Sequence, residues 1–329
     1  MERMIRMLAL LAVLAACWPF ATYGQKAGQP VRIGWISAGN LETHRPMVDA
    51  FHQGMKDLGH IEGKTYVVDF RWGFDTFKSY TWMAHEMMAR QPDVIVATCE
   101  YTSSASLRAT SQVPVVMAIS GDPVKLGYVK SLSAPGTNVT GLAAISPTLA
   151  AKRLELLKEV LPSARRIAVL HQPDDETSHH GLAQARTAAT ALGIELVVFE
   201  ASDPRDYPRA FDAIRAAKPD ALLVMAGTQI AFINRRALAR HTLDARMPTS
   251  FPFYEFVEEG GLMSYGVDIR AQFRRSASYV DRLIKGARPS ELAMEQPTHF
   301  EMTVNRKTAQ ALGVAIPSSI LVRADRVVE

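Results

Sequence analysis

The chain has 329 residues, of which 48% are hydrophobic and 21% are charged, and its formal net charge is +4. This length suffices for about two domains of ordinary size, each with a core of its own. The modest positive charge is spread along the chain and forms no basic stripe, so the composition argues against a nucleic-acid-binding protein.

The first residues have the pattern of a secretory signal. Arg3 and Arg6 precede an apolar run at 7–16, which is too short to span a bilayer. We therefore expect a signal peptide over 1–24 and a periplasmic protein. A second outcome stays open, because the segment that ends at Cys17 also resembles a lipoprotein box, which would place a lipid on that cysteine.

One cysteine lies beyond this leader. The chain has only Cys17 and Cys99, so the mature chain cannot close an internal disulfide. Cys99 follows a predicted strand, and we expect it to be a small buried side chain rather than a reactive thiol.

Strands and helices alternate through the first half of the chain. Apolar and β-branched runs predict strands at 31–36, 66–70, 93–97, 113–119 and 138–142. Apolar residues at helical spacing predict helices at 47–58, at 80–88 and from about 102. The continuous apolar run at 93–97 is typical of a parallel sheet covered on both faces.

After a break at 133–136 the same alternation starts again. Helices are predicted at 150–161, 182–192, 207–217 and 230–241, and strands at 166–170, 194–199 and 221–225. Two such blocks predict an α/β protein of two doubly wound parallel-sheet lobes joined by a hinge.

The last segment is expected to pass back across the hinge. It holds a predicted long helix at 269–285, a strand at 300–304 and a short helix at 306–312. The N-terminal lobe would then comprise 30–143 plus part of 260–329. The C-terminal lobe would comprise 144–259 plus the remainder of that segment.

Candidate ligand contacts lie just after the predicted strands. In open parallel sheets ligands bind beyond the carboxyl ends of the strands, and two facing lobes would place a cleft there. The residues with binding chemistry at or near these positions are Ser37, Thr98, Glu100, Tyr101, Thr102, Asp122, Pro123, Gln172, Thr228, Tyr254 and Tyr265.

Several of these residues have two possible roles. Thr98 and Thr102 stand where a helix begins, so they can cap it or flank backbone N–H groups that bind an anion. Glu100 can complement the helix dipole or hold a ligand amine. Asp122, before Pro123, fits a turn or a carboxylate that faces the ligand. The pattern alone leaves these alternatives open.

Seven segments of the chain match one family. They are 121–124 (GDPV), 138–142 (NVTGL), 152–158 (KRLELLK), 256–266 (FVEEGGLMSYG), 274–287 (RRSASYVDRLIKGA), 295–298 (EQPT) and 311–317 (ALGVAIP). Across essentially the whole mature chain the sequence resembles the ABC-transporter substrate-binding protein family that includes tryptophan-binding TrpX-like proteins.

The resemblance implies a two-lobed periplasmic-binding-protein fold of type I. It also implies delivery of a small solute, amino-acid-like in some relatives, to a membrane permease powered by a separate ATPase. By position in that family, Ser37, Thr98, Asp122 and Pro123 fall where such proteins line the cleft.

Two turns depart from the family pattern. Cys99-Glu100-Tyr101 replaces a small uncharged turn, and His171-Gln172-Pro173 stands where relatives often have Trp-Asn-Pro. These changes indicate a more polar solute, cationic or amine-bearing.

Signatures of other functions are absent from the sequence. It contains no Gly-x-Gly-x-x-Gly after a strand, no P-loop and no Gly-x-Ser-x-Gly elbow. We therefore expect a monomeric solute receptor without catalytic residues, metal, cofactor or nucleic-acid partner. The alternative is a periplasmic ligand-sensing module for a signalling partner.

Overall fold

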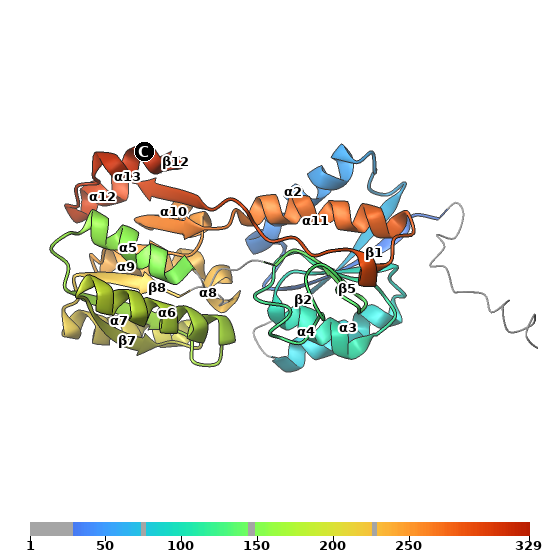
Figure 1. Ribbon diagram of the computed structural model, residues 1–329, viewed down its shortest axis with the longest axis horizontal. Helices are drawn as coiled ribbons and strands as arrows, with labels where there is room; N and C mark the ends of the chain where they lie inside the picture. Colours follow the sequence, from blue (N-terminus) through green and yellow to red (C-terminus); the bar gives the residue numbers. More distant parts are fainter. Residues whose placement is uncertain (1–28, 74–76, 144–148, 226–228) are drawn as a thin grey trace, which may run out of the picture.

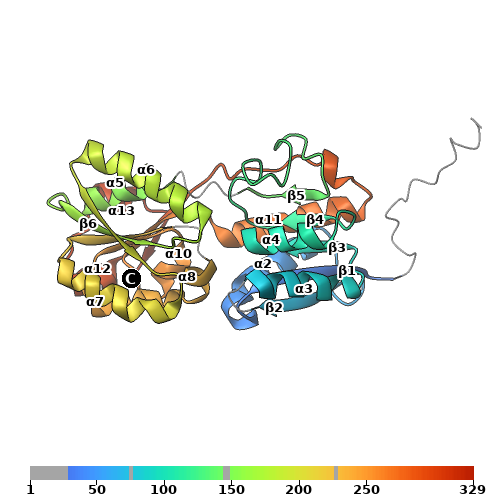
Figure 2. The same cartoon turned by 90° about the horizontal axis from the view of Figure 1, so that it is seen from below.

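The computed structural model describes residues 29–73, 77–143, 149–225 and 229–329, which form two α/β lobes side by side (Figures 1 and 2). The predicted signal peptide, Cys17 included, lies outside the described residues. Within the described ranges no helix is both long and apolar enough to cross a membrane.

The N-terminal lobe is built on a parallel five-stranded sheet in the order β2-β1-β3-β4-β5. Its strands are β1 (Val31–Ala38), β2 (Tyr66–Gly73), β3 (Val94–Ala97), β4 (Val115–Met117) and β5 (Val139–Gly141). The helices between them are α2 (Leu41–Asp57), α3 (Phe77–Ala89) and α4 (Glu100–Ala109).

The C-terminal lobe has a seven-stranded sheet in the order β12-β11-β10-β9-β8-β6-β7. Its strands are β6 (Arg166–His171), β7 (Glu195–Glu200), β8 (Ala221–Val224), β9 (Thr249–Phe251), β10 (Met263–Gly266), β11 (Glu301–Asn305) and β12 (Arg326–Val328). All neighbours pair in parallel except β10 and β11, which are antiparallel. Two α/β lobes with largely parallel sheets are therefore confirmed.

Eight α-helices belong to this lobe among the residues that the structure describes. They are α5 (Ala150–Val160), α6 (Glu176–Leu192), α7 (Tyr207–Ala217), α8 (Gln229–Ile233), α9 (Arg235–Asp244), α10 (Tyr254–Glu258), α12 (Arg306–Leu312) and α13 (Ser318–Arg323).

Two of these helices differ from the sequence prediction. α6 begins six residues before the predicted 182, because Asp175 caps it by accepting a hydrogen bond from Ser178 N at 2.7 Å. The helix predicted at 230–241 is divided into α8 and α9. At the division the Asn234 side chain donates to Ile230 O at 2.9 Å, a local bond that competes with helix continuation.

The chain passes between the lobes three times. It crosses at 142–149, at 267–268 and at 292–300. The first and third crossings run side by side, since Ala143 N donates to Glu295 O at 2.8 Å and Glu295 N donates to Gly141 O at 3.0 Å. The lobes are thus joined by short segments, as hinged domains are.

The second crossing delivers α11 (Ile269–Ile284) to the N-terminal lobe, where it packs along α2 (Figure 1). Gly54 of α2 permits the close approach, because a Cβ built there would lie 2.3 Å from Arg274 O and 2.8 Å from Ala277 Cβ. Beneath the helices, the Trp35 ring lies 5.4 Å from the rings of both Phe51 and Phe273. A helix from the end of the chain therefore completes the first core.

A buried carboxylate lies beside the second crossing. Glu255 in α10 is 1% exposed, and neither carboxylate oxygen has a hydrogen-bond partner among the described residues. Its nearest cation is Arg270, with Nε 4.0 Å from Glu255 Oε1. Burial raises the pKa of Glu255 to about 8, and the guanidinium only partly opposes this.

The close contact at Gly54 predicts that a single methyl group added at this position will lower the stability of the protein. Gly54→Ala should lower the melting temperature by roughly 5 °C or more, because overpacking outweighs the helix propensity that alanine gains. Lys56→Ala, on the exposed side of the same helix, is the matched control for calorimetry. A Gly54→Ala variant as stable as the parent would contradict the packing argument.

Because Glu255 is buried, replacing it with a neutral residue should raise the stability of the folded protein by an amount that depends on pH. The folded state retains this proton up to about pH 8 while the unfolded chain releases it near pH 4.5, so stability is lost as pH rises between these values. Glu255→Gln should raise the melting temperature by a few degrees at pH 8 and change it little at pH 4.5. Equal effects at both pH values would contradict this assignment.

Candidate functional site

A cavity lies between the two lobes at the carboxyl ends of β3, β4 and β9. The empty space between its walls is roughly 630 Å³, including the part that is open to solvent. Both lobes and α11 contribute to its wall, which consists of His44, Met47, Thr98, Cys99, Glu100, Ile119, Ser120, Gly121, Thr177, Gln229, Phe232, Phe253, Ile269 and Phe273.

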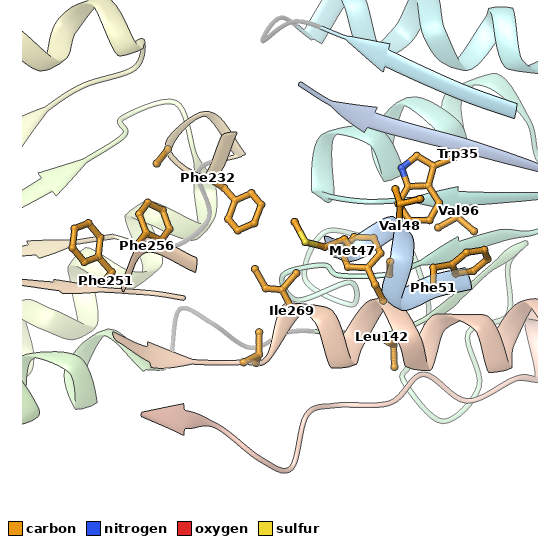
Figure 3. Packing of buried hydrophobic residues seen from close by; sticks show 14 of the residues in the cluster. Trp35, Met47, Val48, Phe51, Val96, Leu142, Phe232, Phe251, Phe256 and Ile269 are labelled. Carbon is orange, nitrogen blue, oxygen red and sulfur yellow. The ribbon is translucent and has the colours of Figure 1, made fainter. Parts of the chain in front are cut away.

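One part of the wall is apolar. Figure 3 shows Phe232 projecting from the C-terminal lobe toward Met47 and Ile269, and all three belong to one continuous buried cluster. Phe253 packs edge-on against Phe232 with ring centroids 6.1 Å apart. Phe273 closes this side from α11. The wall thus offers an aromatic surface to the body of a ligand.

Another part of the wall carries a carboxylate. Glu100 stands at the first position of α4, directly after β3, and Thr177 Oγ1 of the other lobe donates to Glu100 Oε2 at 3.2 Å. A Cβ built on Gly121 would lie 3.2 Å from both of these oxygen atoms, so the lobes meet closely here. Ser120 adds a hydroxyl that is 4% exposed and has no hydrogen-bond partner among the described residues.

Burial makes the charge of Glu100 costly. It raises the pKa of this carboxyl to about 7, and the neighbouring charges of Asp175 and Glu176 act in the same direction, while the hydrogen bond from Thr177 opposes the shift. At neutral pH the cavity therefore holds a carboxylate poised between its two protonation states.

His44 contributes a neutral imidazole. Burial lowers its pKa to about 4, and nearby Arg235 acts in the same direction. Gln229 Nε2 lies 3.1 Å from His44 Nε2, and Thr43 Oγ1 lies 3.0 Å from His44 Nδ1. This arrangement fits a proton on Nδ1, with Nε2 accepting from the amide of the other lobe.

Further hydrogen bonds link the lobes around the cavity. Tyr101 Oη donates to Asp175 Oδ2 at 3.1 Å, and Lys125 pairs with Glu176 at 3.1 Å nearer the surface. Such contacts between residues of opposite lobes indicate a closed arrangement.

The structure brings four of the predicted site residues together on the N-terminal lobe. Thr98 and Glu100 line the cavity. Ser37 lies behind them, with Oγ 2.9 Å from Thr98 Oγ1. Thr102 Oγ1 accepts from Thr98 N at 3.0 Å, so this hydroxyl serves the start of α4. Tyr101 reaches across to the other lobe instead of lining the cavity.

Other predicted residues lie away from this wall. Asp122 is exposed and accepts from Val124 N at 3.1 Å in a turn, with Pro123 beside it. Gln172 is buried and donates its backbone N–H to Ser178 Oγ. The remaining predicted residues divide as follows: Tyr254 packs between Arg270 and Arg326, Tyr265 packs near Phe300, and Thr228 lies outside the described residues.

The sequence interpretation missed the residues that complete the wall. His44 lies in the first turns of α2, before the predicted start of that helix, and Asn40 with Thr43 forms a capping box that marks the true start. Thr177 was hidden by the late start assigned to α6. Phe232 comes from the short helix α8 of the C-terminal lobe. It meets Met47 of the N-terminal lobe only when the two lobes lie together.

No group of three or more His, Cys, Asp or Glu side chains in the described ranges is arranged to hold a metal ion. Cys99 is buried in the cavity wall, and burial raises the pKa of its thiol. The chemistry of the site is therefore one apolar wall, one carboxylate, one imidazole, one thiol and a few hydroxyl and amide groups.

Residues 42–328 match the family of ABC transporter substrate-binding proteins. The chain belongs to this family. It is also 24% identical over 263 residues to a tyrosine-binding protein of Clostridioides difficile, a match that covers 80% of this chain and 75% of that protein.

Two solved structures share the fold. A domain from Streptococcus pneumoniae in complex with L-Trp has a TM-score of 0.83 at 22% identity, covering 91% of this chain and all of that one. The ligand-free, open structure of a substrate-binding protein with adhesive properties from Clostridium difficile has a TM-score of 0.65 at 21% identity, covering 91% and 99%. The fold is that of a type I periplasmic binding protein, as the sequence resemblance implied.

The bond between Tyr101 and Asp175 predicts a weaker closed form when it is removed. Tyr101→Phe should shift the closing equilibrium toward the open form by about tenfold, because a buried carboxylate loses a donor. Small-angle scattering should then report a larger radius of gyration. Tyr265→Phe, which removes a hydroxyl away from the interface, is the control, and equal scattering from both variants would contradict the role of Tyr101.

Proposed function

We propose that this protein is the extracytoplasmic solute receptor of an ABC uptake transporter. It captures a small amino-acid-like solute between its lobes and delivers the solute unchanged to a membrane permease. The observation that carries the proposal is the cavity whose wall is shared by both lobes and α11. Binding there couples occupancy to closure, because the complete wall exists only when the lobes meet.

The amine of the solute is assigned to the carboxylate side of the cavity. Glu100 is buried beside Asp175, and none of the described residues forms an ion pair with it, so a ligand ammonium would supply the missing positive charge. The names of two relatives, a tyrosine-binding protein and a complex with L-Trp, support an amino-acid-like solute with an aromatic body.

The cellular setting is part of the same proposal. The basic and apolar pattern of residues 1–16 supports export to the periplasm, with Cys17 as the candidate lipid anchor. The protein would act as a monomer without cofactor, metal or nucleic acid, and its macromolecular partner would be the permease. It would not be an enzyme, since the proposed role needs only groups that bind the solute.

A solute screen tests this function. Thermal unfolding of the purified mature protein should shift upward by about 5–10 °C at a solute concentration one hundred times its Kd. The panel comprises amino acids, amines and purines, and mass spectrometry of the recovered solute should show it unaltered. A panel with no stabilising member, or a chemically converted solute, would refute the proposal.

A further inference from the structure

The charge of the cavity is one-sided. Glu100 is its carboxylate, His44 is neutral, and the residues of its wall that the structure describes include no Lys or Arg. A zwitterionic solute would therefore find a partner for its ammonium and no cation for its carboxylate.

The nearby cations are already engaged. Arg235 Nη1 donates to Thr43 O at 3.3 Å and to Phe232 O at 3.2 Å, and its Nε lies 3.9 Å from Glu259. Lys125 pairs with Glu176. Turning Arg235 toward the cavity would break its contacts, and Lys125 lies at the solvent-exposed rim and is not part of the cavity wall.

The starts of α4 and α6, the two longer helices that begin at the cleft, are also taken. Backbone N–H groups at such starts are the usual alternative anchor for a carboxylate. At α4, the Cys99 side chain accepts from Thr102 N in the first turn, and Glu100 occupies the first position. At α6, Asp175 accepts from Ser178 N. A second carboxylate placed at either start would meet the negative charge already there.

The rest of the wall matches an apolar body with one extra polar group. The Phe232, Phe253 and Phe273 side chains line the cavity, and aromatic faces also attract an organic cation. Ser120 Oγ, buried and with no hydrogen-bond partner among the described residues, offers one further hydrogen bond next to Gly121, the residue whose Cβ would approach Glu100.

We propose, on the basis of the function proposed above, that the solute is a primary amine with an aromatic or similarly apolar body and no carboxylate. Its ammonium lies against Glu100 and its body against the phenylalanine rings. The site therefore favours the decarboxylated form of an aromatic amino acid over the amino acid itself.

Matched pairs test this preference directly. Calorimetric titration at pH 8 compares tyramine with tyrosine, tryptamine with tryptophan, and phenethylamine with phenylalanine. Each amine should bind at least about tenfold more tightly than its amino acid, because the added carboxylate meets like charge without a cation. An amino acid that binds as tightly as its amine, or a neutral or carboxylate-bearing solute as the best ligand of the wider screen, would overturn the inference and leave the receptor function intact. A screen with no binder would refute the receptor function itself.

Substitution of the carboxylate identifies its role. Glu100→Gln should weaken amine binding by about thirtyfold or more and bring the ratio within each pair toward one. Glu42→Gln, the same change at an exposed position in the first turn of α2, should leave both affinities unchanged. An amine affinity that survives Glu100→Gln would overturn the assignment, provided that calorimetry shows the variant folded.

The pH dependence of wild-type binding is an independent readout. The free carboxyl has a pKa of about 7 and must lose its proton to pair with an ammonium, so amine affinity should rise about tenfold from pH 6 to pH 8 and then level off. The titratable or charged groups around Glu100 are Asp175 and Glu176 on α6, Cys99 and Tyr101 on its own segment, Tyr128, and Lys125 with His180 at the rim. Glu100→Gln should abolish the slope, and a slope that persists in that variant would assign the titration to another of these groups and overturn the role of Glu100.

Discussion

The packing of α11 on α2 is the contact on which the rest of the molecule depends. Without a side chain at Gly54 the two helices approach closely enough to cover the aromatic core beneath them. Because α11 comes from the end of the chain, this contact requires the polypeptide to cross to the second lobe and return. The hinge is thus a consequence of how the first core is completed.

The same helix connects core and cavity. Phe273 stacks on Trp35 on one side and lines the cavity on the other, while Ile269 stands where the second crossing ends. Lobe movement therefore pivots next to a residue of the ligand wall. This geometry couples opening of the cleft to the segment that holds the N-terminal lobe together.

Two buried carboxylates illustrate how surroundings give one chemical group two roles. Glu255 is enclosed by protein, so its proton is retained and its effect is on stability. Glu100 is buried as well but lines the cavity between the lobes. Since no described residue forms an ion pair with it, the proposed ligand ammonium would supply its counter-charge from outside the protein.

The sequence predicted what depends on local pattern and on the geometry of parallel sheets. Alternating apolar runs located the strands, and the rule that ligands bind beyond their carboxyl ends pointed to Thr98 and Glu100. The sequence could not show whether Asp122 forms a turn or contacts a ligand, because an aspartate is common in both roles. It also missed Thr177 and Phe232, whose positions follow from how the second lobe folds and closes over the first. The sequence does contain the helix cap, since Asp175 stands three residues before Ser178. Recognising it would have placed the start of α6 correctly.

The absence of a side chain at Gly121 also constrains how this site can diversify. A Cβ at this position would lie 3.2 Å from both Glu100 Oε2 and Thr177 Oγ1, so a larger residue would require these side chains to shift at the contact between the lobes. A descendant of this protein that acquires a bulkier solute would therefore have to find room at the phenylalanine end of the chamber. Selection for new nutrients should accordingly leave position 121 alone and exchange the aromatic rings opposite it.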